Sequence, residues 1–401
     1  MSDDFYRIKR LPPYVIAEVN AMRAEARATG EDIIDLGMGN PDLPPPQHVI
    51  DKLCEVARNP GAHGYSASKG IPGLRKAQAN YYQRRFGVDL NPDTEVVVTL
   101  GSKEGLANLA QAITAPGDVV LAPNPSYPIH TFGFIIAGAT IRSVPTTPDE
   151  RYWEALERAM AFTVPRPSVL VMGYPSNPTA EVVDLAFYER VVAFAKEHKL
   201  WVLSDLAYSE LYYDGCPTPS ILQVPGAKDV AVEFTSLSKT YSMAGWRIGF
   251  AVGNPQLISA LTRVKSYLDY GAFTPIQAAA VAAINGPQDI VEQNRQLYQR
   301  RRDVLIESFG RAGWDIPPPR ASMFAWAPLP PALAHLGSLE FSKQLLTHAK
   351  VAVAPGVGYG ENGEGYVRIA MVENEQRLRQ AARNVKRYLQ SMGVNTPART
   401  G

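Results

Sequence analysis

Between Glu95 and Gly253, short apolar runs rich in β-branched residues alternate with stretches in which apolar residues recur at helical spacing. The runs predict strands at residues 95–100, 119–123, 139–144, 168–175, 201–205, 230–238 and 247–253. The intervening stretches predict helices at residues 103–114, after Tyr127, near Trp153 and at residues 185–198. Apolar strands alternating with helices favour an α/β fold, with a mostly parallel sheet covered by helices.

The two ends of the chain follow a different pattern. Residues 17–29 predict a helix that ends at Gly30, and the glycines and prolines that follow, up to residue 46, interrupt regular structure. From Thr274 two long helical patterns lead into short predicted strands and a last helix at residues 375–389. The predicted strands of this part are residues 323–326, 351–353 and 366–370. We therefore predict an N-terminal arm with part of a small domain (1–44), a large domain (45–273) and a smaller C-terminal α+β domain (274–401).

Composition narrows the possible functions. The chain has 401 residues, 46% of them hydrophobic, and a formal charge of +1, so it can bury a large core but offers no strong field to nucleic acid or an anionic membrane. Residues 1–10 lack an apolar leader core, and the most apolar stretch, residues 132–137, is far below membrane-spanning length. Cys54 and Cys216 have no disulfide or metal-ligand spacing, and we expect both to be packed. We predict a soluble cytoplasmic protein without a metal, a nucleic-acid partner or a membrane partner.

Two short motifs match known patterns but lack the neighbouring sequence features that those patterns require. Residues 358–363 satisfy GxGxxG, but the sequence after them predicts a strand where a dinucleotide site needs a helix, so we interpret them as a glycine-rich turn. Residues 236–239 satisfy the SxxK pattern of acyl-enzyme hydrolases, but the chain contains neither a KTG nor an SDN partner motif.

The informative segment is SLSKTYSMAGWRIG, residues 236–249. Lys239 follows an apolar run directly, so it is predicted at the carboxyl end of a buried strand, where open α/β sheets bind ligands. A desolvated lysine near another cation can act as an amine nucleophile toward an aldehyde. Ser236, Ser238 and Arg247 supply hydroxyl and guanidinium groups suited to a phosphate. Together these residues indicate a site for pyridoxal 5′-phosphate (PLP).

This segment is similar, position for position, to the lysine signature of the class I and II aminotransferases, the aspartate-aminotransferase-like enzymes of PLP fold type I. Further motifs of the family occur in order along almost the whole chain. The resemblance implies that Lys239 binds PLP covalently, that the large domain holds the cofactor, and that a smaller C-terminal domain completes the site.

Three residues are implied as partners of the PLP ring. Asp205, after the strand WVL, matches the anion beside the pyridine nitrogen, although a carboxylate after a strand is also common as a helix N-cap. Tyr208 and Asn177 match the residues that bond the ring's 3-oxygen. On its own the SNPT sequence around Asn177 is merely typical of a turn.

Four more residues are implied around the cofactor, three at its phosphate and one on the face of its ring. Ser102 and Lys103 lie in GSKEG, between a predicted strand and helix, where backbone N–H groups bind phosphate; a capping turn is the alternative. Tyr127 matches the aromatic residue that stacks on the ring, and packing is its alternative. Tyr65 matches a tyrosine that reaches the phosphate of the neighbouring subunit, which implies a homodimer with shared active sites.

The substrate residues implied are Arg368, Gly37, Asn177 and, in the N-terminal arm, Tyr14. Arg368, in YVRIA, matches the clamp for the α-carboxylate, because a guanidinium pairs with a carboxylate through two hydrogen bonds; a surface ion pair is its alternative. Gly37 lacks a side chain, which lets its backbone approach the carboxylate.

The resemblance implies ping-pong transamination between amino acids and 2-oxo acids. Over the whole chain the likeness is strongest to bacterial alanine aminotransferases that use glutamate and pyruvate, through motifs such as HGYSASKGIPGLR and VKSYLDYGAFTP. We therefore predict exchange between L-alanine with pyruvate and 2-oxoglutarate with L-glutamate. The alternatives are another donor (LL-diaminopimelate, an aromatic amino acid or aspartate), a carbon–sulfur lyase of the same fold, and a PLP-sensing regulator domain.

Overall fold

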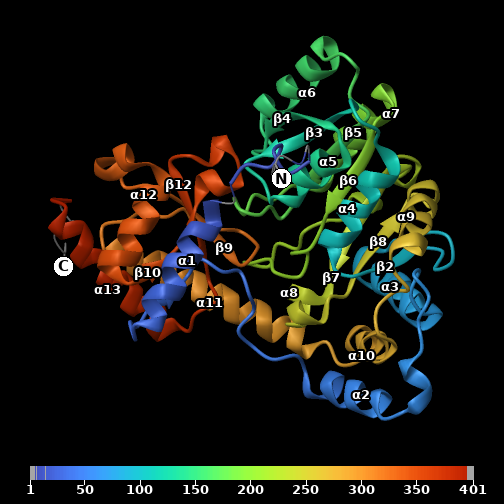
Figure 1. Cartoon of the computed structure of the whole chain (residues 1–401), viewed down its shortest axis with the longest axis horizontal. Helices are drawn as coiled ribbons and strands as arrows, with labels where there is room; N and C mark the ends of the chain where they lie inside the picture. Colours follow the sequence, from blue (N-terminus) through green and yellow to red (C-terminus); the bar gives the residue numbers. More distant parts are fainter. Residues whose placement is uncertain (1–4, 6, 14, 395–401) are drawn as a thin grey trace.

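A computed structural model describes residues 5, 7–13 and 15–394, and its larger part is built on a seven-stranded sheet (Figure 1). The strands are β2 (Val96–Thr99), β3 (Val119–Asn124), β4 (Thr140–Pro145), β5 (Val169–Gly173), β6 (Trp201–Asp205), β7 (Ala231–Ser236) and β8 (Gly249–Gly253). Their order is β2-β8-β7-β6-β5-β3-β4, and only β8 runs antiparallel to its neighbours. The predicted α/β fold with a mostly parallel sheet is confirmed.

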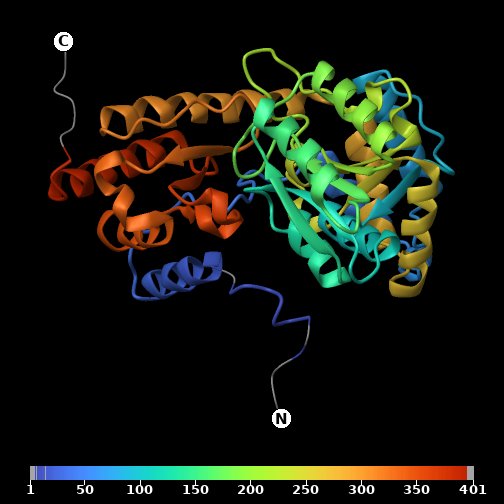
Figure 2. The same cartoon turned by 90° about the horizontal axis from the view of Figure 1, so that it is seen from above.

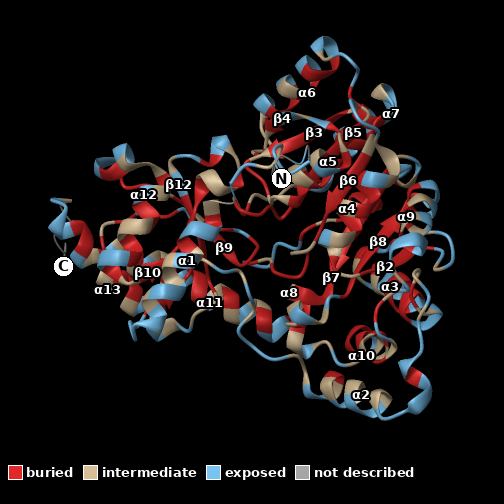
Figure 3. Ribbon diagram, in the orientation of Figure 1, coloured by how far each residue is buried: buried red, intermediate tan, exposed pale blue. Residues whose placement is uncertain are grey.

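Helices cover both faces of this sheet, as the continuous apolar runs predict. In β5, Val169 and Val171 pack with α4, α5 and α9, whereas Leu170 and Met172 face the opposite core with α6 and α7. Figure 3 shows the buried strands between helices that are exposed on their outer sides. The helices of this part are α2 (Gln47–Ala57), α3 (Pro72–Phe86), α4 (Ser102–Ile113), α5 (Ile129–Ala137), α6 (Glu150–Phe162), α7 (Leu185–His198), α8 (Leu237–Thr240), α9 (Pro255–Leu268) and α10 (Thr274–Asn285).

Local chemistry explains why α7 has the predicted bounds. The Asp184 side chain accepts a hydrogen bond of 2.9 Å from the Phe187 N–H and so satisfies a free donor in the first turn. At the other end Lys199 adopts a left-handed conformation with φ of 58°, which ends the helix.

A second, smaller group of strands lies at the other end of the molecule (Figures 1 and 2). It contains the antiparallel sheet β11-β12-β9 and the parallel pair β1-β10. Because β1 pairs with β10, the N-terminal segment joins strands more than 300 residues later in the chain. The bounds here are β1 (Ile34–Asp35), β9 (Phe324–Pro328), β10 (Val351–Ala352), β11 (Ala354–Pro355), β12 (Tyr366–Ala370), α1 (Val15–Ala28), α11 (Asp289–Arg311), α12 (Gly337–Gln344) and α13 (Glu375–Ser391).

Two helices after residue 273 differ in what they pack against. The buried alanines of α10 belong to the core of the large sheet, with α2 and α3. Helix α11 buries Val291 in that core and its later residues, such as Leu305 and Phe309, in the core of the smaller unit. It therefore connects the two parts, while the domain boundaries at residues 44 and 273 stay predictions.

The glycine-rich segment between β11 and β12 forms two short 3-10 turns, Gly356–Tyr359 and Glu361–Gly363, before the next strand begins. No helix starts at Gly363, so the interpretation as a turn is confirmed. At Gly360 a Cβ atom would lie 2.2 Å from the Asn124 side chain, and φ is +125°, so the turn requires glycine.

Two further observations concern surface and membrane. Cys54 and Cys216 are both exposed free thiols, so the prediction that they are packed is wrong. Within residues 5, 7–13 and 15–394, none of the helices combines the length and apolarity needed to cross a lipid bilayer.

Candidate active site

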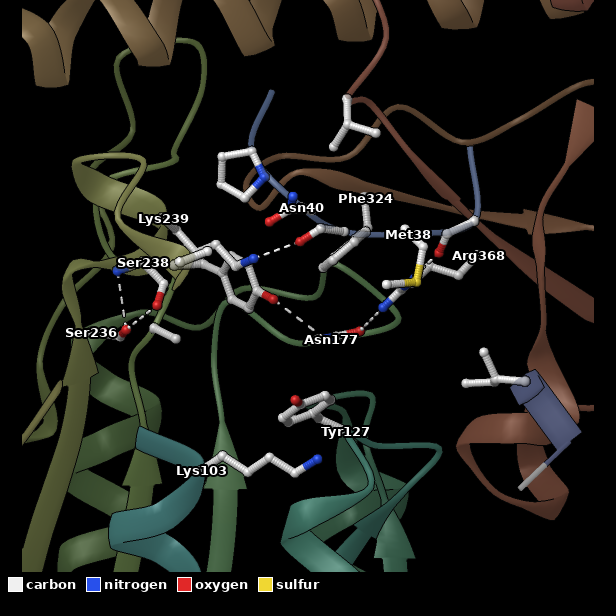
Figure 4. Close-up of a pocket in the computed structure, with 18 of the residues that line it drawn as sticks. Met38, Asn40, Lys103, Tyr127, Asn177, Ser236, Ser238, Lys239, Phe324 and Arg368 are labelled. Atoms are coloured by element: carbon white, nitrogen blue, oxygen red, sulfur yellow. Dashed lines mark hydrogen bonds between the residues drawn. The ribbon is translucent and has the colours of Figure 1, made fainter. Parts of the chain in front are cut away.

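A cavity of about 1000 Å³ lies between the carboxyl ends of the large-sheet strands and the smaller group of strands (Figure 4). Its walls come from segments that are far apart in sequence: the start of α4, the ends of β6 and β7, residues 37–42, and strands β9 and β12. The structure brings together most of the predicted site residues around it, namely Gly37, Ser102, Lys103, Tyr127, Asn177, Asp205, Tyr208, Ser236, Ser238, Lys239, Arg247 and Arg368.

Lys239 lies in the single turn of α8, directly after the buried strand β7. Its Nζ donates a hydrogen bond of 2.6 Å to the Gly39 carbonyl and has no carboxylate partner among the described residues. Burial, followed by the nearby positive charges of Arg368 and Arg247, lowers the pKa of this amine to about 8. A substantial fraction of the lysine is therefore a neutral, nucleophilic amine near pH 8.

On one side of Lys239 lies a group of hydrogen-bond donors. Ser236 caps α8 by accepting from the Ser238 N–H at 3.1 Å, and its hydroxyl donates to the Ser238 Oγ at 2.8 Å. Helix α4 begins at Ser102 without a side-chain cap, and Ser102 and Lys103 of its first turn line this side of the cavity. Arg247 adds a guanidinium. Hydroxyls, a helix N-terminus and a cation are the groups that bind a phosphate ester.

Gly101 allows Arg247 to approach this helix start. At Gly101 φ is +85°, and a Cβ atom there would lie 2.0 Å from the Arg247 Nη2. Nη2 also donates to the Leu100 carbonyl at 3.4 Å, while Nη1 donates to the Ala244 carbonyl at 2.7 Å. The absence of a side chain at residue 101 thus brings the guanidinium beside the first turn of α4.

Asp205 lies at the end of β6 and is buried. One carboxylate oxygen accepts from the Ala207 N–H at 3.2 Å, and the other is 2.9 Å from His130 Nε2. No helix begins after β6, so the alternative of a helix N-cap is wrong. The other ring nitrogen of His130 is buried and has no partner among the described residues. This carboxylate is held by an imidazole and a backbone N–H, and it lines the cavity.

Asn177 and Tyr208 lie between Lys239 and the smaller unit. The Asn177 side chain donates to the Tyr208 hydroxyl at 3.4 Å and accepts from Arg368 Nη1 at 3.0 Å. Burial raises the pKa of Tyr208 well above its ordinary value, so its hydroxyl stays protonated and can donate a hydrogen bond.

Arg368 is the cation on the opposite side of the cavity. It is buried, so its alternative interpretation as a surface ion pair is wrong. Its Nη2 donates to the Gly37 carbonyl at 2.7 Å, its guanidinium carbon lies 4.0 Å from the centre of the Phe324 ring, and it pairs with no carboxylate among the described residues. A planar cation held by neutral groups and an aromatic face is suited to bind a carboxylate.

Lys103 and Tyr127 lie together at the cavity wall in Figure 4. The Lys103 Nζ is 5.7 Å from the centre of the Tyr127 ring. The ring therefore has one face near a cation and lines the same cavity as Lys239.

Two predicted residues are not part of this arrangement. Tyr65 does not line the cavity; it is 89% exposed, and its ring centre lies 4.6 Å from that of Tyr270. Tyr14 lies outside the described residues.

Sequence reasoning missed several lining residues, notably His130, Phe324 and the carbonyl of Gly39. The first two lie in PSYPIH and ASMFAWA, but a histidine or phenylalanine in such a segment carries no signal of its own. Gly39 acts through its backbone, which composition does not reveal. No cluster of three metal-ligating side chains occurs in the described part of the chain, residues 5, 7–13 and 15–394.

Known proteins resemble this chain over nearly its whole length. AatC of Rhizobium meliloti (strain 1021), which its name assigns provisionally to the aminotransferases, is 65% identical over 97% of this chain and 96% of its own. The glutamate-pyruvate aminotransferase AlaC of Escherichia coli (strain K12) is 53% identical over 97% of this chain and 95% of its own. An LL-diaminopimelate aminotransferase of Moorella thermoacetica is 44% identical over 96% of this chain and 97% of its own.

Solved structures agree with this relationship. The substrate-bound structure of BacF from Bacillus subtilis is 36% identical, with a TM-score of 0.89, and the match covers 97% of this chain and 98% of BacF. The family described as Aminotransferase class I and II matches residues 31–385. That range contains Lys239, the hydroxyl and guanidinium donors beside it, and the buried Arg368. This chain therefore belongs to the class I and II aminotransferases.

Proposed function

We propose that the protein is a PLP-dependent aminotransferase that exchanges the amino group between L-alanine with pyruvate and 2-oxoglutarate with L-glutamate. The observation that carries this proposal is the convergence of Lys239, the phosphate-type donor group and the buried Arg368 on one cavity. The 53% identity to a glutamate-pyruvate aminotransferase supports the choice of substrates.

The residues present fit PLP. Ser102, Ser236, Ser238 and Arg247 would hold its phosphate, with Lys103 nearby, and Asp205 would pair with its pyridine nitrogen. Asp205 suits that role because the only side chain bonded to it among the described residues is the His130 imidazole, and no lysine or arginine neutralises it. Tyr127 would cover the ring, while Tyr208 and Asn177 would bond its hydroxyl oxygen.

When bound, PLP supplies an aldehyde that takes up the amino group and a ring that withdraws electrons from the substrate's α-carbon. Lys239, with its pKa lowered to about 8, would hold the cofactor through its amine and would be the group placed to carry a proton to and from the substrate's α-carbon. Asp205 would favour a proton on the ring nitrogen electrostatically, and a protonated ring withdraws electrons more strongly.

Arg368 binds the α-carboxylate shared by amino acids and 2-oxo acids. The Phe324 ring packs against one face of the guanidinium. The carbonyl oxygens of Gly37 and of the Asn177 side chain accept its hydrogen bonds and so fix its orientation. Both half-reactions use this clamp, because donor and acceptor carry the same carboxylate at the same distance from the reacting carbon.

A homodimer with shared active sites belongs to this proposal. Tyr65, Tyr267 and Tyr270 are 89%, 83% and 62% exposed, and the ring centres of Tyr65 and Tyr270 lie 4.6 Å apart. Exposed aromatic side chains that lie together mark interaction sites. A second copy of the chain covering this surface would place Tyr65 near the partner's phosphate group, as the family resemblance implies.

The decisive experiment is the absorption spectrum of the PLP-loaded protein, recorded before and after L-alanine and again after 2-oxoglutarate. We expect alanine to remove the yellow band and 2-oxoglutarate to restore it. A protein that takes up no PLP would contradict the whole proposal, whereas a yellow protein unaffected by alanine would contradict only the substrate.

The same titration tests a second candidate, LL-diaminopimelate as amino donor. The 44% identity to an LL-diaminopimelate aminotransferase favours including it. Bleaching by LL-diaminopimelate at a concentration at which alanine has no effect would assign the protein to that donor.

A further inference from the structure

Lys265, on α9, is completely buried and carries its charge between two carboxylates. Its Nζ lies 3.0 Å from a Glu104 oxygen and 2.9 Å from an Asp269 oxygen. Exchanging a buried ion pair for apolar side chains of similar size is often neutral or stabilising, so such a pair is weak evidence of a role in stability alone. The two carboxylates belong to different segments, the first turn of α4 and the residue directly after α9.

Glu104 lies in the first turn of α4, two residues after Ser102. One of its oxygens accepts from Lys265 and from the Asn108 amide, and the other accepts from the Leu100 N–H at 2.9 Å. The Leu100 carbonyl accepts from Arg247 at 3.4 Å. The residue that leads into Gly101 and Ser102 is thus held by Glu104 through its N–H and by Arg247 through its carbonyl.

Asp269 is fixed independently, just after α9. Its second carboxylate oxygen accepts from the Gly271 N–H at 2.6 Å, and its carbonyl accepts from the Ser68 hydroxyl. Gly271 has φ of +80°, and a Cβ there would lie 2.3 Å from the Ala67 carbonyl, so this segment is packed closely against residues 67–68. Lys265 is therefore supported by an anchored carboxylate on the side away from α4.

We propose that Lys265 is a positioning residue for the phosphate side of the site. Anchored by Asp269, its ammonium holds the Glu104 carboxylate in the orientation in which it binds the Leu100 N–H. That hydrogen bond fixes the turn 100–102, which presents the N–H groups of α4 and the Ser102 hydroxyl. This inference rests on the proposed function, because it assumes that the donor group binds the phosphate of PLP.

The test compares PLP with pyridoxal, which has the same ring and aldehyde but lacks the phosphate. Binding of each to the full-length protein stripped of cofactor is measured for wild type and for Lys265→Met, which replaces the ammonium by an unbranched apolar side chain one atom shorter. We expect the dissociation constant for PLP to rise about tenfold, as for a lost charged hydrogen bond, while that for pyridoxal stays within about twofold.

Lys228→Met is the matched control. Lys228 also pairs with a carboxylate, Glu95, at 3.0 Å, but it is partly exposed, and Glu95 precedes β2 and is not part of α4. We expect its PLP and pyridoxal affinities to equal those of wild type. Equal weakening of both ligands by Lys265→Met would indicate general damage to the fold and overturn the inference, as would unchanged PLP binding.

A second variant tests the route through Glu104, and it keeps the inference testable if the Lys265→Met protein does not fold. Glu104→Gln removes the charge that Lys265 attracts, and we expect it to weaken PLP in preference to pyridoxal. In the double variant the effect of Lys265→Met should largely disappear, because both changes break the same link. Additive effects would refute the route. Wild-type protein that binds neither ligand would refute the proposed function, a result visible before any variant is compared.

Discussion

The two sides of the cavity are built in different ways. The side around Lys239 is made from the ends of strands in the large sheet and of a helix that covers it. Ser102 starts helix α4, Asp205 ends β6, and Ser236 ends β7. The side around Arg368 joins segments from opposite ends of the chain, since Arg368 bonds the Gly37 carbonyl 331 residues away. The first side depends on strand direction, and the second depends on long-range pairing.

This difference separates cofactor from substrate in the proposed function. The sheet side carries the donors for phosphate and the lysine, whereas the side of the smaller unit offers one buried cation backed by Phe324. Variants on the sheet side should therefore change PLP binding or chemistry, and variants on the other side should change substrate affinity.

The largest effect is expected for Lys239→Ala. Removing the amine removes both the covalent attachment and the proton carrier, so kcat should fall by more than about 10⁴-fold. PLP should still bind without a covalent bond, because the phosphate donors remain. Turnover and a spectrum after denaturation measure the two effects, with the surface variant Lys228→Ala as control. Substantial turnover would remove Lys239 from its assigned role.

Arg368→Lys should give the next largest effect, confined to the substrate. Lysine keeps the charge but loses the planar pair of donors and the stacking on Phe324, so kcat/KM for L-alanine should fall about 10²-fold, mainly through KM. PLP retention should equal that of wild type. Arg377→Lys, which alters an exposed pair with Asp32, is the control. Loss of PLP from Arg368→Lys would break the separation of the two sides.

The pH dependence of PLP attachment links the two sides. Burial and the charges of Arg368 and Arg247 lower the Lys239 pKa from 10.5 to about 8. Only the neutral amine attacks, so the rate of attachment to cofactor-free protein should rise about tenfold per pH unit below pH 8 and level off above it.

The variant Arg368→Gln tests how much the Arg368 charge contributes to the lowered pKa of Lys239. It removes one of the positive charges that disfavour the ammonium, so the midpoint should move to higher pH but stay below 10.5, because burial still acts. Stopped-flow rates at several pH values measure the shift, and Arg368→Lys, which keeps the charge, should not show it. A wild-type midpoint near 10.5 would contradict the lowered pKa.

The smallest effect is expected for Tyr65→Phe, which removes one hydroxyl from the exposed surface. If a second copy places that hydroxyl at its phosphate, PLP should dissociate a few times faster, as for the loss of one hydrogen bond. Tyr267→Phe, a change of the same kind on an equally exposed ring, should leave the rate unchanged. Equal rates for both variants and wild type would count against a shared site.

Much of the sheet side was predictable because its signals are local. An apolar run followed by Ser236, Ser238 and Lys239 predicts a strand end with a lysine, and the structure has β7 leading into α8 there. The direction of β8 was not predictable in this way. Its residues are as apolar as those of a parallel strand, and only its connection to β7 makes it antiparallel.

The other side was harder to predict from residues alone. An isolated Arg368 favoured a surface ion pair, and Asp205 was compatible with a helix N-cap; only the structure shows a buried guanidinium and a strand end without a following helix. His130 and Lys265 carried no signal, because a histidine or lysine within a helical pattern does not reveal which carboxylate it meets.

The sequence by itself determined the α/β fold class, the family and the lysine signature, because hydrophobic periodicity and short motifs act between residues that are neighbours in the chain. The tertiary structure decided that Arg368 lies opposite Lys239, that the Lys239 pKa is lowered, and that Lys265 supports the turn before α4. These properties arise from burial and from charges brought together across hundreds of residues. They depend on distance in space, which no local pattern encodes.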